Sequence, residues 1–151
     1  MRYFKSKMLV GLGEEGTMGV ALYPEFEKSI LGYDPSTAIS GKALAHAVGG
    51  GRGEIEQMCH RLGGVPIFDF YSESNEEAFA KIGEPVPAGL PPEEPLKWSD
   101  PAQGLRTVEA LLACPDLEAM PPRVSEDLKS FRAILFKAAE HGTRFRLRID
   151  M

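Results

Sequence analysis

Apolar side chains recur every three or four residues along much of this chain, and that spacing places them on one face of a helix. The longest stripe joins Leu128, Phe131 and Leu135, and Gly142 follows its last turn. A glycine there commonly ends a helix, because glycine adopts the left-handed conformation without strain. The pattern predicts five helices, at residues 40–48, 53–64, 74–83, 100–113 and 125–142.

Two of these helices begin at recognisable capping residues. Ser74 lies three residues before Glu77, which is the spacing of a capping box. Asp100 precedes Pro101, so its carboxylate can accept hydrogen bonds from free backbone N–H groups while the proline occupies the first turn. These signals predict where the third and fourth helices start.

The stretch TRFRLRID, residues 143–150, alternates strictly between apolar and polar side chains, as a strand with one buried face does. A single strand leaves backbone hydrogen-bonding groups unpaired, so it needs a partner. The β-branched and aromatic run near residues 18–23 is the natural partner, and Pro24 is expected to end it. The C-terminal strand therefore pairs with an N-terminal one.

These elements predict an α+β fold, in which a small sheet of the N-terminal and C-terminal strands is covered mainly on one side by about five helices. Residues 18–151 form a single domain, and residues 1–17 are expected to be a flexible N-terminal extension. The proline-rich stretch 83–97 is interpreted as a loop within the domain, because only one strand follows it.

Composition and charge exclude several classes of protein. With 43% hydrophobic and 26% charged residues, the 151-residue chain has the composition of an ordinary globular domain. No apolar run is long enough to span a membrane, and the net charge of −5 argues against general nucleic-acid binding. Cys59 and Cys114 lack metal-binding spacing and fit a reducing compartment, so we expect a cytoplasmic protein without zinc.

A glycine motif near the start raises the question of a nucleotide site. Gly11, Gly13 and Gly16 have the spacing G-x-G-x-x-G, which binds dinucleotides when a helix begins on the glycines. Here a strand-like run follows, and Glu14 and Glu15 lie where phosphates would bind. We therefore expect no nucleotide cofactor.

Catalytic groups are also scarce. Cys59 and His60 are adjacent on a predicted helix, so their side chains diverge instead of forming a dyad. The carboxylates of residues 69–77 lack the spacing of a calcium loop and are explained by helix capping. Arg52, within the GGGRG run, could flank an anion-binding nest, although a glycine hinge between helices is the favoured interpretation. No catalytic residue and no metal site is predicted.

One constellation could bind a ligand. Arg144, Arg146 and Arg148 share the polar face of the C-terminal strand. The row could face solvent and be answered by acidic groups on a neighbouring element, or it could bind an acidic partner or an anion together with Arg52.

Four stretches of the chain resemble a family of small uncharacterised bacterial α+β domains: MGVALYPEF, SGKALAHA, DPAQGLRTVEALL and EHGTRFRLRIDM. The resemblance covers most of residues 18–151 and brings no catalytic residues with it. It implies a role like that of immunity or adaptor proteins.

The leading hypothesis is a non-catalytic cytoplasmic module that binds another protein. A small-molecule or anion-binding domain that uses the arginine row is the alternative, and a hydrolase of unknown type is the third hypothesis. Nothing in the sequence indicates the oligomeric state.

Overall fold

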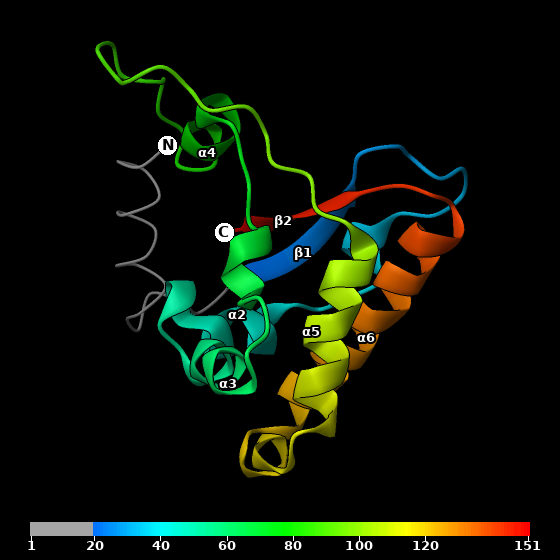
Figure 1. The fold of residues 1–151 in the computed structure, drawn as a ribbon. Coiled ribbons are helices and arrows are strands. Elements are labelled where there is room, and N and C mark those ends of the chain that lie inside the picture. The colour runs from blue at the N-terminus through cyan, green and yellow to red at the C-terminus, as the bar shows by residue number, and fades with distance from the viewer. Residues whose placement is uncertain (1–19) are drawn as a thin grey trace.

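The computed structural model describes residues 20–151 (Figure 1). Two predictions, the N-terminal extension and the glycine motif at Gly11, Gly13 and Gly16, lie outside the described residues. Within residues 20–151, no helix has the length and apolar character needed to cross a lipid bilayer.

The sheet contains two antiparallel strands, β1 (Ala21–Phe26) and β2 (Phe145–Asp150). Their register runs from Ala21 opposite Asp150 to Phe26 opposite Phe145. The predicted pairing of an N-terminal with a C-terminal strand is therefore confirmed, and so is the small α+β fold.

The expectation that Pro24 ends the first strand is wrong, because β1 continues to Phe26. The N–H of Leu22 donates to the carbonyl of Gly41 and not to β2. Since alternate residues of a strand point their N–H groups the same way, the position of Pro24 also faces away from β2. Proline is tolerated there because no bond between the strands is lost.

Five α-helices lie in the described part of the chain, one for each predicted stretch. The last one begins at Pro122 instead of Ser125, because proline is well accommodated in the first helical turn. The helices are α2 (Lys42–Val48), α3 (Glu54–Leu62), α4 (Asn75–Ala80), α5 (Pro101–Ala113) and α6 (Pro122–Glu140).

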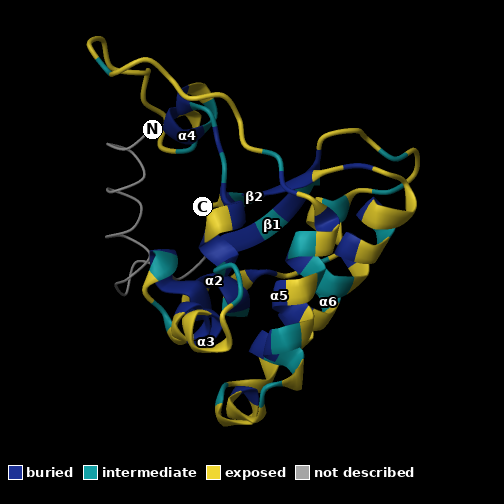
Figure 2. Ribbon diagram, viewed as in Figure 1, coloured by how far each residue is buried: buried dark blue, intermediate teal, exposed yellow. Residues whose placement is uncertain are grey.

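The core lies between one face of the sheet and the helices α2, α5 and α6 (Figure 2). Phe145, Leu147 and Ile149 are buried on this face, as their alternation predicted. The ring of Phe145 lies 5.9 Å from that of Phe131 on α6, measured between centroids. On α5, a Cβ added at Gly104 would lie 2.9 Å from the Phe145 ring, so the glycine allows the helix to approach the sheet.

The opposite face of the sheet carries the arginine row, and residues 71–72 and Ser99 pair with the free edge of β2. Ser72 donates its N–H to the carbonyl of Leu147, and Ser99 exchanges two backbone hydrogen bonds with Phe145. Between these two contacts come α4 and the exposed proline-rich loop, which extends away from the sheet (Figure 1).

Two buried carboxylates hold loops to helices. Asp127 on α6 accepts hydrogen bonds from the N–H groups of Gly41 and Leu44, at 3.2 and 3.0 Å. Glu56 on α3 accepts from the N–H groups of Ile67 and Phe68, at 2.9 and 3.2 Å. Burial raises the pKa of Glu56 to about 7, despite these two hydrogen bonds.

Candidate functional site

Arg146 and Arg148 share one face of β2, Arg144 immediately precedes the strand, and each of the three contacts a glutamate. Arg144 donates two hydrogen bonds to the carboxylate of Glu27, with N–O distances of 2.8 and 2.6 Å. Its side chain remains 55% exposed. Glu27 immediately follows β1, where the register continues to place the two residues side by side.

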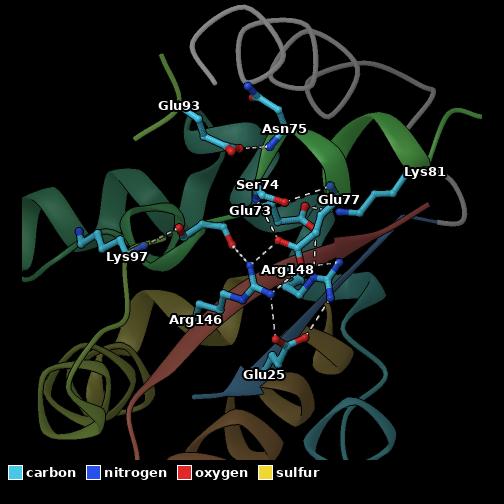
Figure 3. Close-up of polar contacts among 11 residues, drawn as sticks. Glu25, Glu73, Ser74, Asn75, Glu77, Lys81, Glu93, Lys97, Arg146 and Arg148 are labelled. Atoms are coloured by element: carbon cyan, nitrogen blue, oxygen red, sulfur yellow. Dashed lines mark hydrogen bonds and ion pairs between the residues drawn. The ribbon is translucent and has the colours of Figure 1, made fainter. Parts of the chain in front are cut away.

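The expectation that the row faces solvent is wrong for Arg146, because only 4% of its side chain is exposed. Its guanidinium donates to both carboxylate oxygens of Glu77, at 2.8 and 2.6 Å, and to Glu25 at 2.8 Å (Figure 3). It also donates to the carbonyl of Ser72 at 3.1 Å. The residue is buried because the Glu25 and Glu77 carboxylates, the Ser72 carbonyl and the indole of Trp98 surround its guanidinium.

Glu77 was recognised in the sequence only as a capping residue, and the structure gives it two roles. The predicted capping box is present: Glu77 accepts from the N–H of Ser74 at 2.9 Å, and Ser74 Oγ accepts from the N–H of Glu77 at 3.1 Å. The same carboxylate binds Arg146, which is 69 positions away. The cap thereby orients α4 toward the sheet.

Arg148 completes the network at the other end of the row (Figure 3). It donates to Glu73 at 3.0 Å and to Glu25 at 2.9 Å, and it lies 3.3 Å from Glu77. Glu73, whose side chain is fully buried, also binds Lys81. Arg148 therefore joins β1, β2 and the segment that begins α4.

The network is electrically balanced. Its three carboxylates face an equal number of cations, and its members are Glu25, Glu73, Glu77, Lys81, Arg146 and Arg148. Hydrogen bonds from Arg146 lower the pKa of Glu77 to about 2, although burial opposes the change. An added anion would compete with carboxylates that these guanidinium groups already bind.

Arg52, the fourth predicted binding residue, is exposed after the turn Gly49–Gly51 and takes part in none of the ion pairs found within residues 20–151. The glycines around it have a structural reason. Gly50 has a positive φ of 65°, and a Cβ at Gly53 would lie 2.0 Å from the carbonyl oxygen of Ala47. This geometry is that of a tight hinge between α2 and α3.

The cysteine and carboxylate candidates do not assemble a reactive centre in the described residues. Cys59 is buried, and burial raises the pKa of its thiol to about 11, whereas His60 is exposed. Residues 20–151 contain no group of three or more side chains that could hold a metal ion.

A groove of about 610 Å³ lies beside the network, along β1 and the segment that follows it. Four aromatic residues line it: Tyr23, Phe26, Tyr33 and Trp98. Its lining includes three carboxylates and no lysine, arginine or histidine. Sequence reasoning missed this groove, because its walls come from β1, residues 27–36 and Trp98, which share no periodic pattern.

Hydrogen bonds on both sides of Trp98 fix its position. The N–H of Lys97 donates to Ser72 Oγ at 2.8 Å, and the N–H of Ser99 donates to the carbonyl of Phe145 at 2.7 Å. The Arg146 guanidinium lies over the indole, 5.1 Å from its ring centroid. The network thus supports one wall of the groove.

The other rings are held in similar ways. Tyr33 stacks on Phe26, with centroids 6.0 Å apart, and Lys137 Nζ lies 5.6 Å from the centroid of the Tyr33 ring. The guanidinium of Arg148 lies 5.9 Å from the centroid of Tyr23. Tyr23, Tyr33 and Trp98 each remain partly exposed. The groove therefore presents positioned aromatic surface to its surroundings.

Comparison with known proteins shows no match to a family model, a curated protein or a solved structure. The resemblance to small bacterial α+β domains stays a prediction, and the function has to be argued from the groove and the network.

Proposed function

We propose that this chain is a non-catalytic protein-binding module and that the groove along β1 is its contact surface. The observation that carries the proposal is the aromatic lining, formed by Tyr23, Phe26, Tyr33 and Trp98 in a space of about 610 Å³. Partly exposed tyrosine and tryptophan side chains give large contact area at a small cost in side-chain entropy, and they dominate the energy of protein interfaces.

The charge of the two surfaces favours the groove over the arginine row. In the row, Arg146 and Arg148 are bonded to glutamates of the same chain, so an acidic partner gains little there. Of the three carboxylates that line the groove, Glu25 and Glu27 are paired with arginines of the row, and Asp34 forms no ion pair with a described residue. A partner with a neutral or basic contact segment therefore fits this site better than the acidic partner expected from the row.

The proposal agrees with the other features of the chain. Its two free cysteines, Cys59 and Cys114, suit a reducing compartment such as the cytoplasm. Binding another protein is also how an immunity or adaptor protein acts, which is the role implied by the family resemblance.

Affinity capture from the source cells tests the proposal when groove and control variants are compared. Tyr33→Ala removes a groove ring, and Phe136→Ala removes a half-exposed ring of α6 that does not line the groove. We expect a partner that the wild type and Phe136→Ala retain and Tyr33→Ala loses. Equal retention by all three proteins would refute the groove as the contact surface, and loss only in Phe136→Ala would assign the contact to α6.

A further inference from the structure

We infer that the groove binds a proline-rich segment of the partner protein, in the extended polyproline conformation and with a basic residue at one end. The inference rests on the proposed function and adds the chemistry of the ligand. Aromatic-lined grooves are the general solution for polyproline recognition, because flat rings pack against the ridges of a helix that is already ordered before binding.

Cations that already lie over the aromatic rings of the groove favour an uncharged ligand group at these rings. Trp98, Tyr33 and Tyr23 each already have a cation close to one face, from Arg146, Lys137 and Arg148. A cation on one face weakens the attraction of the other face for a second cation, since both draw on the same ring electrons. Proline rings and aliphatic groups are therefore better occupants than lysine or arginine at these positions.

Hydrogen-bond donors of the groove match the backbone of such a ligand. Within the described residues, the hydroxyls of Tyr23 and Tyr33 and the indole N–H of Trp98 have no hydrogen-bond partner. A polyproline segment has no internal hydrogen bonds, so its carbonyl groups are free to accept. These three donors belong to residues that line the groove, so they are available to the carbonyl groups of such a ligand.

Pro24 disfavours the main alternative for an extended ligand, which is addition of a strand to the edge of β1. A continuous ladder requires N–H groups along the free edge, and Pro24 supplies none at the centre of that edge. The side-chain donors of Tyr23, Tyr33 and Trp98 do not depend on the backbone N–H groups of β1, so Pro24 does not affect them.

The charge of the groove lining predicts the basic residue. Glu25 and Glu27 are each paired with arginines of the chain. Asp34 is exposed, accepts from the N–H and Oγ of Ser36, and forms no ion pair with a described residue. An arginine or lysine of the ligand next to Asp34 would supply the missing cation.

The same charge argues against a second copy of this chain as the occupant. The chain has its own proline-rich loop at residues 83–97, which carries Glu84, Glu93 and Glu94 but only one basic residue, Lys97. A net negative loop next to Asp34 would be repelled. A separate protein with a proline-rich, basic segment is therefore the expected ligand.

Trp98 is the only tryptophan of the chain, so its fluorescence reports directly on the groove. The probes are a decaproline peptide with a terminal arginine, the same peptide with glutamate in place of the arginine, and an alanine-rich peptide with the arginine. We expect a saturable change in Trp98 emission with the first probe and an affinity about tenfold lower or worse in Tyr33→Ala, as for a central aromatic contact. The alanine-rich probe should not saturate.

Conservative variants separate the parts of the argument. Tyr33→Phe keeps the ring and removes the donor, so it should weaken binding less than Tyr33→Ala. Asp34→Asn should abolish the preference for the arginine peptide over the glutamate peptide, which is expected to be about two- to fivefold for an exposed ion pair. Asp116→Asn, a change at another exposed aspartate outside the groove, should preserve that preference.

Three results would overturn the inference. The first is the absence of saturable binding for every proline-rich probe at millimolar concentration, and the second is equal binding of the alanine-rich probe. The third is an emission change that depends on protein concentration alone, which would identify a second copy as the occupant. If a partner is nevertheless captured and is lost in Tyr33→Ala, the proposed function stands and only the ligand class is wrong.

Discussion

Replacing Arg146 by alanine should destabilise the protein far more than an exposed arginine on a strand would suggest. The side chain is 4% exposed, and its guanidinium donates four hydrogen bonds, to Glu25, to both oxygens of Glu77 and to the carbonyl of Ser72. Removing one partner of a fully buried ion pair costs about 3–5 kcal/mol, because the other charge is left without compensation.

The expected cost here is lower, about 2–3 kcal/mol of the free energy of unfolding, for two structural reasons. Glu25 and Glu77 keep 36% and 26% of their side chains exposed, so water can solvate them. Both also keep contacts with Arg148. Urea unfolding followed by far-UV circular dichroism measures the change without relying on Trp98, which Arg146 contacts directly.

The matched control is Arg144→Ala, in the same row and with its own glutamate partner. Arg144 is exposed, so this change should leave the free energy of unfolding nearly unaltered. Equal stability of Arg146→Ala and wild type, or equal losses in the two variants, would refute the conclusion that burial of the central ion pair distinguishes Arg146 from Arg144.

Other predictions concern the core and the buried carboxylates. Phe145→Ala should cost about 3–5 kcal/mol in chemical unfolding, because the ring is fully buried. Gly104→Ala should lower the melting temperature, since its Cβ would lie 2.9 Å from the Phe145 ring and overpacking of about 1–3 kcal/mol exceeds the gain of about 1 kcal/mol in helix propensity. Glu56 has a raised pKa, so the folded state holds its proton while the unfolded state loses it, and stability should fall as the pH rises from 4.5 to about 7. Glu56→Gln should remove that part of the pH dependence. For Glu77 the sign is opposite: its contribution is present above pH 4.5 and should be lost as the pH falls toward about 2, a loss that Glu77→Gln should remove.

Local patterns in the sequence predicted the elements and their buried faces well. The alternation of residues 143–150 identified Phe145, Leu147 and Ile149 as core, and the Ser74–Glu77 spacing identified the capping box of α4. Each of these signals involves residues only a few positions apart in the sequence. They report which face of an element is apolar and where a helix starts, and they contain nothing about what packs on the polar face.

The predictions that were wrong depend on contacts between residues that are far apart in the sequence. Whether Pro24 ends a strand depends on which way its missing N–H would point, and the pairing register with β2 decides this. Arg146 is buried because Glu77, remote in sequence, is brought over it by the path of residues 71–99. The groove likewise requires Tyr33 and Trp98 to meet, although no local pattern links them.

The arginine row and the groove are parts of one arrangement, and this explains why the most conspicuous charges of the sequence are not the proposed site. Glu25 contributes both to the network and to the groove lining, and Arg146 bonds to Glu25 while its guanidinium lies over Trp98. Because the row is neutralised within the chain, the aromatic residues of the groove, and not the arginines, form the contact surface that we propose. The ion-pair network thus supports the proposed contact surface, because the same guanidinium that binds Glu77 of α4 also lies over the Trp98 ring.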